Sequence, residues 1–268
     1  MTFSLLLEDA KLMANLSSVI SSIVAESNFK VSEDGISIKA FDATRISMID
    51  FFMKKEAFNK YEVDDSASIG LSLETLNSIL KTAKTTEHLK MSLNDETKRF
   101  EVIFLGKNQK RKFALSLIDI HEEGTIPDTI HIDFDANFEV KATFLQQVIK
   151  DAEMISDYLR VKANPDGVTF SAESDTKEMS TYIEPLSEEM GTDAYNVVDE
   201  SESVYSLDFL ANFVKGIRSS DSVKISFSQE QPLRIVYDIE DKGHLIYFVA
   251  PRIEESEVID DYDDYESN

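Results

Sequence analysis

The sequence predicts an α+β fold of two similar domains, each with two helices packed on antiparallel sheets. Three observations support this fold class. The chain repeats itself, it contains four amphipathic helical stretches, and runs of short strands broken by turns separate those stretches. Amphipathic helices mixed with many antiparallel strands are typical of sheets that are covered on one face by helices.

The repeat involves two separate blocks of sequence. Residues 34–40 (DGISIKA) return 132 residues later as residues 166–172 (DGVTFSA). Ser72-Leu73-Glu74 returns 134 residues later as Ser206-Leu207-Asp208, and residues 89–93 correspond in the same way to residues 223–227. Two blocks that recur in the same order at almost the same offset indicate a duplicated domain. The length of 268 residues suits two domains of ordinary size.

In the first half, the chain alternates between helical and strand patterns. A helix is predicted over residues 8–24, with Leu12, Leu16, Val19, Ile20 and Ile23 on one face, and another over 72–83, with Leu73, Leu76 and Leu80. Strands are predicted over 30–40, 45–53, 89–93, 99–105 and 111–117, with turn residues such as Glu33-Asp34-Gly35 nearby. The order of these elements leaves open whether each half is itself doubled.

The second half repeats the two helices. One carries Leu145, Val148, Ala152 and Ile155 on its apolar face, and the other carries Leu207, Leu210, Val214 and Ile217. Residues 118–133 contain a Gly and a Pro and no sustained period, which is typical of a connector. We therefore predict an N-terminal domain at 1–117, a connecting loop at 118–133, a C-terminal domain at 134–253 and an acidic tail at 254–268.

Composition limits the class of protein. There is no cysteine, which excludes disulfides and thiolate chemistry, and no apolar run approaches the roughly 18 residues of a membrane span. The N-terminus lacks the pattern of an export signal, so an intracellular location is expected. A net charge of −24 for the whole chain would usually argue against nucleic-acid binding. The charge is unevenly distributed, however, since eight of the acidic residues lie in the last 15 positions. That tail is predicted to be disordered; a cation site within it is the alternative.

No pattern of catalytic residues is evident. His88, His121, His131 and His244 lack metal-ligand spacing, and no glycine-rich phosphate loop is present. The paired acids Asp64-Asp65 are followed by Ser66, a setting typical of a solvated turn. We therefore expect no enzyme activity, no metal and no cofactor.

Three segments resemble a known family. Residues 243–255 (GHLIYFVAPRIEE), residues 39–48 (KAFDATRISM), and residues 117–120 (LIDI) followed by Ile126-Pro127 are similar to the proliferating cell nuclear antigen family. The members are the DNA sliding clamps of eukaryotes and archaea. The resemblance covers almost the whole chain and implies the DNA-clamp fold. It also implies a trimeric ring, with helices lining a central hole, that serves as a processivity factor in DNA replication and repair.

A clamp needs sequence-independent attraction to phosphates from its helices. The Lys81/Lys84 pair recurs as Lys215/Arg218 at the 134-residue offset. The alternative interpretation is that these cations merely lie near helix C-termini, where the helix dipole favours them. The first helix departs from the basic pattern of the family, since Ser18, Ser21 and Ser22 dominate its polar face. The expected DNA-facing residues are Lys11, Lys81, Lys84, Lys150, Lys215 and Arg218.

The resemblance also implies a hydrophobic pocket that receives peptides from DNA polymerase, flap nuclease and ligase. Taken without the resemblance, most of the residues concerned are ordinary core or strand residues. Pro251 should end the last strand and free the segment after it for strand addition to a peptide. Gly124 stands where family members have a leucine. The expected pocket residues are Phe41, Ile46, Met48, Ile126, Pro127, Pro232, Phe248, Val249, Ala250 and Pro251.

Subunit contacts are expected at two sheet edges, around residues 110–117 and 177–183, paired head to tail. The expected residues are Lys110, Arg111, Lys112, Phe113, Leu115, Lys177, Met179 and Tyr182. A homotrimer is predicted, although the sequence leaves open whether the neighbouring subunit is an identical chain. Further expected partners are double-stranded DNA and a clamp loader, with no membrane, in the cytoplasm of an archaeon or a nucleus. The alternative function is an acidic interaction protein or DNA mimic that binds basic partners.

Overall fold

The computed structural model describes residues 3–94, 96–120, 126, 130–190, 195–217 and 221–253. The first half contains β1 (Phe3–Leu7), α1 (Ala10–Ile23), β2 (Glu26–Val31), β3 (Gly35–Phe41), β4 (Ser47–Lys54), η1 (Lys55–Ala57), β5 (Lys60–Val63), β6 (Ala67–Ser72), α2 (Leu73–Leu80), β7 (His88–Asn94), β8 (Arg99–Leu105) and β9 (Lys110–Ser116). The second half contains β10 (Ala136–Lys141), α3 (Ala142–Glu153), β11 (Tyr158–Asn164), β12 (Gly167–Ser174), β13 (Lys177–Ile183), β14 (Asn196–Val197), β15 (Ser201–Ser206), α4 (Leu207–Val214), β16 (Ser222–Phe227), β17 (Leu233–Asp238) and β18 (Gly243–Val249).

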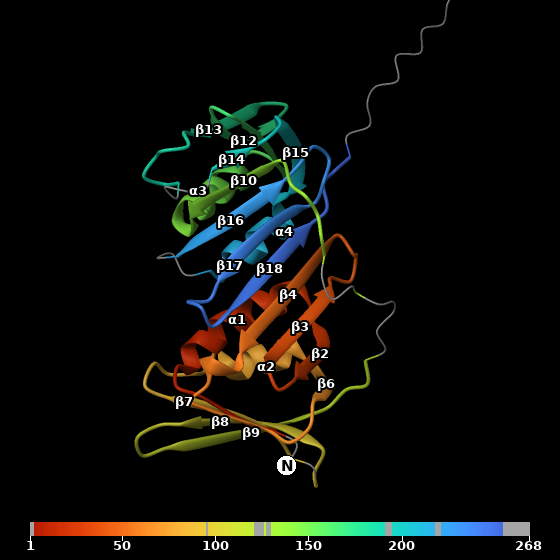
Figure 1. Ribbon diagram of the computed structural model, residues 1–268, viewed down its shortest axis with the longest axis vertical. Helices are drawn as coiled ribbons and strands as arrows, with labels where there is room; N and C mark the ends of the chain where they lie inside the picture. The colour runs from red at the N-terminus through yellow and green to blue at the C-terminus, as the bar shows by residue number, and fades with distance from the viewer. Residues whose placement is uncertain are drawn as a thin grey trace, which may run out of the picture.

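The strands form three antiparallel sheets. A five-stranded sheet has the order β5-β1-β7-β8-β9, and a four-stranded sheet has the order β13-β12-β11-β15. The third sheet has nine strands in the order β14-β10-β16-β17-β18-β4-β3-β2-β6 and crosses both halves of the molecule (Figure 1). The two halves meet where β18 pairs with β4, from Gly243 opposite Met53 to Val249 opposite Ser47. A continuous backbone ladder therefore fixes one half against the other.

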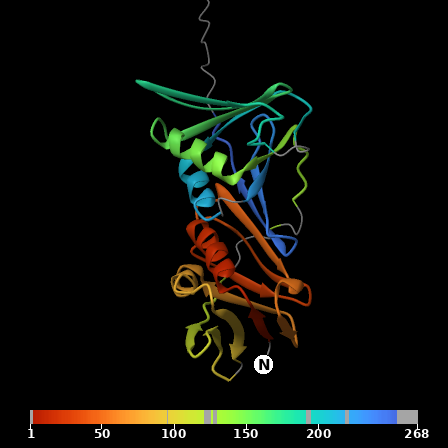
Figure 2. The same cartoon turned by 90° about the vertical axis from the view of Figure 1, so that its left-hand side faces the viewer.

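The four helices lie together on one side of the molecule. Figure 2 shows them along one edge, with the nine-stranded sheet behind them. Helix α4 contacts both α3 and α1, and α1 contacts α2, so the row runs α3, α4, α1, α2. No helix in the described ranges is long and apolar enough to cross a membrane.

The predicted apolar stripes of the helices are confirmed. Leu12, Leu16 and Val19 of α1 are buried, as are Leu145 and Val148 of α3. The stripe of α2 and Leu207, Leu210 and Val214 of α4 are buried too. Ile23 is only half-buried, however, and the predicted Ile155 and Ile217 lie beyond the ends of α3 and α4. Burial of such a stripe against the sheets supplies most of the stability of a short helix.

Some predicted boundaries were wrong. Helix α2 ends at Leu80 rather than at residue 83, because a turn follows in which the N–H of Ala83 donates to the Leu80 carbonyl at 2.9 Å. The predicted strand over residues 30–40 is split into β2 and β3 by a turn, closed by the Ser32 N–H donating to Gly35 at 2.9 Å. Strands β5 and β6 were not predicted, but residues 64–66 between them do form a loop.

Candidate nucleic-acid interface and partner patch

The repeated cations occupy equivalent places in the fold. Lys81 is the C-cap of α2, and its N–H donates to the Asn77 carbonyl at 2.8 Å. Lys215 is the C-cap of α4, and its N–H donates to the Ala211 carbonyl at 3.2 Å. Both side chains are exposed. The duplication therefore places one lysine at the same end of a helix in each half.

The other expected DNA-facing lysines also lie on or beside the helices. Lys150 is exposed in the last turn of α3, Lys84 is exposed just beyond α2, and Lys11 is half-buried in the first turn of α1. Arg218 lies outside the described residues. No ion pair within the described part of the chain involves Lys11, Lys81, Lys84, Lys150 or Lys215.

The serines of α1 connect the helices to one another. The Ser18 hydroxyl lies 3.1 Å from Asn77 Oδ1 of α2, and the Ser22 hydroxyl donates to the Asn212 carbonyl of α4 at 3.3 Å. Ser22 thereby joins the two halves of the molecule. In the sequence these serines are only a departure from a basic pattern. The contact between Ser22 and Asn212 was not predictable, because it depends on the packing of α1 against α4.

Three expected pocket residues lie in one row across the outer face of the nine-stranded sheet. Phe41 of β3 is opposite Met48 of β4, and Met48 is opposite Phe248 of β18, so the three side chains point to the same side. Phe41 and Ile46 are 40% and 41% exposed, whereas Met48 is buried at 1%. The Ala250 N–H donates to the Ile46 carbonyl at 2.8 Å. We call Phe41, Ile46, Met48 and Phe248 the outer patch.

The remaining expected pocket residues surround the outer patch to different degrees. Ile126 and Phe41 line the same open cleft. Pro232 precedes Leu233, which is opposite Val249. Val249 is fully buried and faces the core, while Ala250 and Pro251 are half-buried. Pro127 and Gly124 lie outside the described residues. The fold thus brings together segments near residues 41–48, 126 and 232–251.

Asp42 organises the turn that carries the outer patch. Its carboxylate accepts hydrogen bonds from the Thr44 N–H at 2.8 Å and the Ser47 N–H at 2.5 Å, and from both hydroxyls. Burial raises the pKa of Asp42, but these hydrogen bonds outweigh burial and leave the pKa below its ordinary value. Arg45 in the same turn has a left-handed φ of 60°, and its guanidinium carbon is 6.0 Å from the Phe41 ring centroid.

Arg234 lies at the edge of the outer patch and is not among the residues expected from the sequence. Arg234 of β17 is opposite Phe248, so it lies on the same face of the sheet. Its guanidinium carbon is 5.9 Å from the Phe134 ring centroid, and its Nε is buried without an acceptor among the described residues. The available signal was the alternation in residues 233–236, where an arginine interrupts an otherwise apolar strand.

Strand β9 is an edge of the five-stranded sheet. The Arg111 guanidinium pairs with the buried Glu87 carboxylate at 2.7 Å and lies 4.5 Å from the Phe104 ring centroid. Burial raises the pKa of Glu87, but hydrogen bonds from Arg111 and the Lys84 N–H outweigh burial and lower it. Leu115 is buried and Phe113 is half-buried, while Lys110 and Lys112 are exposed, with Lys112 paired to Glu101 at 2.7 Å. The exposed Lys110 and Lys112 therefore lie along the backbone edge of β9.

Strand β13 is an edge of the four-stranded sheet. Lys177 donates from Nζ to the Met154 carbonyl at the end of α3 at 3.4 Å. Tyr182 is 52% exposed, and its hydroxyl donates to the Asp166 carbonyl at 2.6 Å. Met179 between them is half-buried. Within the described strands, β9 pairs only with β8 and β13 only with β12, and the head-to-tail prediction requires such unpaired edges.

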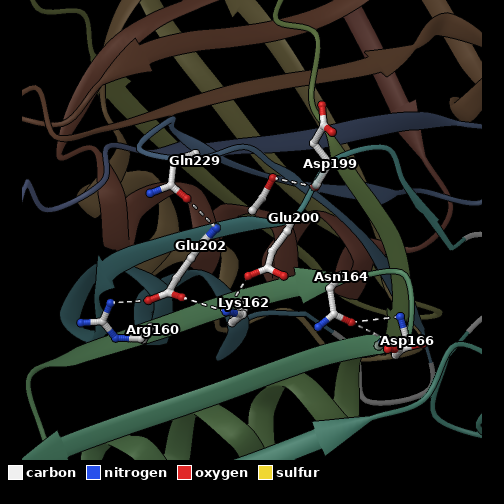
Figure 3. A network of polar contacts seen from close by, with 10 residues as sticks. Arg160, Lys162, Asn164, Asp166, Asp199, Glu200, Glu202 and Gln229 are labelled. Atoms are coloured by element: carbon white, nitrogen blue, oxygen red, sulfur yellow. Dashed lines mark hydrogen bonds and ion pairs between the residues drawn. The ribbon is translucent and has the colours of Figure 1, made fainter.

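The outer face of the four-stranded sheet carries a network of charges (Figure 3). Glu202 pairs with Arg160 at 2.7 Å, and Lys162 pairs with Glu200 at 2.6 Å. The Glu202 N–H also donates to Gln229 Oε1 at 3.1 Å. Acids and bases alternate across partly exposed strands, which is the arrangement of a solvated surface ladder. Among the described residues, no group of three or more His, Asp or Glu is placed to hold a metal ion.

Two halves joined through one sheet, with four helices in a row on one side, define the DNA-clamp fold. The chain matches the family models described as the proliferating cell nuclear antigen N-terminal domain, over residues 2–124, and C-terminal domain, over residues 125–252. The chain belongs to the proliferating cell nuclear antigen family. The family membership that the sequence resemblance predicted is therefore confirmed.

Relatives and solved structures agree with this assignment. The chain is 36% identical to a protein named DNA polymerase sliding clamp from Thermococcus gammatolerans, over 95% of this chain and 100% of the relative. It superposes on a crystal structure of PCNA from Thermococcus kodakaraensis with a TM-score of 0.87 and 25% identity, over 94% of this chain and 100% of that one. A structure of the C-terminal region of FEN-1 bound to A. fulgidus PCNA shares the fold, with a TM-score of 0.83 and 24% identity, over 95% of this chain and 100% of that one.

Proposed function

We propose that the chain is a subunit of a DNA polymerase sliding clamp, a non-catalytic processivity factor that encircles duplex DNA. The observation that carries the proposal is the equivalence of Lys81 and Lys215 at the C-caps of α2 and α4, on the side where all four helices gather. Neither lysine has an acidic partner within the described ranges. Cations without local counter-ions attract phosphates regardless of base sequence. A DNA mimic would have no use for cations at equivalent positions.

Three copies close the proposed ring through their sheet edges. The exposed backbone of β9 pairs with that of β13 in the next subunit, so each contact joins two different edges and closes on the third copy. Arg111 pairs with Glu87 in its own domain and Leu115 is buried, whereas Phe113 on the same face of β9 is only half-buried. The contact therefore relies on the strand backbones, Lys110, Lys112 and the exposed part of Phe113 on one side, and Met179 and Tyr182 on the other. The acidic remainder of the chain discourages DNA from binding outside the ring.

The outer patch is the proposed docking site for peptides of polymerases, nucleases and ligase. Phe41 and Ile46 are exposed, and Phe248 continues the row on the same face of the sheet. In the solved A. fulgidus structure, the C-terminal region of FEN-1 is bound to PCNA. Such tethering requires no chemistry in the clamp itself. The proposed place of action is on chromosomal DNA inside the cell.

A processivity assay with polymerase and clamp loader tests the DNA-facing role. The Lys81→Ala/Lys84→Ala/Lys215→Ala/Arg218→Ala variant should give shorter extension products, and the defect should grow as the salt concentration rises. The matched control removes four exposed or half-exposed lysines outside the four α-helices, as Lys54→Ala/Lys55→Ala/Lys60→Ala/Lys242→Ala. Products of unchanged length with the first variant would remove these cations from the mechanism.

Size-exclusion chromatography with light scattering tests the ring. The purified chain should elute at three times its mass of 30.3 kDa. Phe113→Arg should shift it toward the monomer, because an added charge at the half-buried edge opposes pairing with β13. The control His88→Arg places the same charge at an exposed position of β7, an inner strand of the same sheet. A stable monomer of the unmodified chain would refute the homotrimer.

A further inference from the structure

The outer patch has exposed apolar side chains, and Arg234 at its edge has a buried Nε without an acceptor among the described residues. Phe41 and Ile46 are exposed, and Arg234 lies three strands from Phe41 in the same row, a span of about 14 Å at ordinary strand spacing. A buried N–H such as Arg234 Nε is unfavourable without an acceptor. No ion pair in the described part of the chain involves Arg234. The surface therefore fits an occupant that is apolar at one point and anionic at another.

The last 15 residues of the chain have this chemistry. Residues 254–268 contain eight acids and no lysine or arginine. Their large apolar or aromatic residues are Val258, Ile259, Tyr262 and Tyr265. Asp261 and Asp263 flank Tyr262 directly, and Asp260 follows Ile259. Apolar anchors beside acids match a surface on which the exposed Phe41 lies about 14 Å from Arg234.

The chain leaves the described structure close to the outer patch. The Ala250 N–H donates to the Ile46 carbonyl at 2.8 Å, and the Arg252 N–H donates to the Val204 carbonyl at 2.7 Å. The Arg252 guanidinium carbon also lies 4.1 Å from the Tyr158 ring centroid. These contacts hold the start of the tail beside the patch. Ile259 follows Ile253 by six residues, so an extended chain reaches about 20 Å from that point.

We propose that residues 254–268 dock in cis on the outer patch and compete there with partner peptides. Ile259 and Tyr262 lie against Phe41 and Ile46, and a neighbouring aspartate pairs with the partly exposed Arg234 guanidinium. The proposed competition with partner peptides rests on the proposed peptide-binding function of the outer patch. The proposed contact between the tail and the outer patch does not depend on that function. A tethered segment acts at an effective concentration in the millimolar range, so a weak contact is sufficient.

A direct titration tests the docking contact. The probe is a fluorescent peptide of residues 254–268, titrated with a chain that ends at Ile253 and keeps every described helix and strand. Binding should saturate, and Arg234→Gln should weaken it about tenfold. Arg99→Gln, at an exposed position of β8, is the matched control and should bind as the parent chain does. Absence of saturation overturns the contact, and so does an equal loss in both variants, which would indicate attraction to net charge alone.

A competition experiment in the full chain tests the regulatory part. The probe is the C-terminal peptide of A. fulgidus FEN-1, measured by fluorescence polarisation. Ile259→Ala/Tyr262→Ala should bind it about fivefold more tightly than the unmodified chain, while Ser256→Ala/Ser267→Ala should not differ. Equal affinities of all three chains overturn the competition. If the probe binds none of them, the proposed peptide-binding function fails and the competition falls with it, while the direct titration still decides the docking contact.

Discussion

Gly216 packs against Val19 with no space for a side chain. A Cβ at position 216 would lie 2.1 Å from Val19 Cγ2 and 3.2 Å from Val19 Cβ. Val19 belongs to α1 in the first half, and Gly216 follows α4 in the second half. The close packing of Gly216 on Val19 and the hydrogen bond from Ser22 to the Asn212 carbonyl both hold α1 of the first half against the α4 region of the second half.

Replacing Gly216 should therefore destabilise the protein. Gly216→Ala forces a methyl group into Val19, which is 1% exposed and stiff at its branched Cβ. Overpacking of this kind costs about 1–3 kcal/mol in the free energy of unfolding. Urea denaturation of the variant and the unmodified chain, at one fixed chain concentration, measures this loss in the free energy of unfolding. Gly106→Ala is the control, because the nearest atom to its added Cβ is 3.5 Å away, and it should change stability by less than about 0.5 kcal/mol.

The fold was largely predictable because its signals are local and repeated. Stripes such as Leu73, Leu76 and Leu80 give the helices, and the duplication gives their equivalence. The pairing of β18 with β4 was not predictable from such signals, since it joins residues almost 200 positions apart, from strands that each show an ordinary alternation. The unsatisfied Nε of Arg234 likewise depends on which strands become neighbours, and periodicity along one strand carries no such information.

Replacing the N-cap serine should destabilise the protein more at α2 than at α4, although Ser72 and Ser206 are equivalent in the repeat. The Ser72 hydroxyl caps α2 by accepting from the Thr75 N–H at 3.2 Å, whereas Ser206, its repeat equivalent, makes no side-chain cap to α4. Ser72→Ala should therefore lower the free energy of unfolding by about 1 kcal/mol, and Ser206→Ala by less than about 0.5 kcal/mol. Thermal denaturation of both variants checks this. Equal losses would contradict the assignment of a cap to Ser72 alone.

The buried Glu87–Arg111 pair should make stability depend on pH. The side chain of Glu87 is 3% exposed, and its folded pKa lies below the ordinary value of 4.5. The pair therefore stabilises the folded state above pH 4.5, and this contribution is lost as the pH falls through the lower folded pKa. Glu87→Gln leaves Arg111 without its counter-charge and should cost about 3 kcal/mol at pH 7.

The difference between the unmodified chain and Glu87→Gln should close in acid, because both side chains are then neutral. Urea denaturation at a series of pH values from neutral to acid measures it. Glu62→Gln is the control, since Glu62 and its partner Lys60 are more than half exposed, and it should cost less than about 1 kcal/mol throughout. A difference that stays constant with pH would mean that the charge of Glu87 is not what stabilises the fold.

Asp42 should control the outer patch through the shape of its turn. Its carboxylate accepts from the backbone N–H groups of Thr44 and Ser47, between which Arg45 adopts a left-handed φ. Asp42→Ala removes both acceptors, so the turn that holds Ile46 beside Phe41 should lose its fixed geometry. Affinity for the FEN-1 peptide should fall about tenfold, while the circular dichroism spectrum keeps the signal of the folded chain. Asp65→Ala, in the exposed loop between β5 and β6, removes the same charge far from the patch and should leave the affinity unchanged. A similar loss in both variants would show that net charge, and not the geometry of the turn, governs peptide binding.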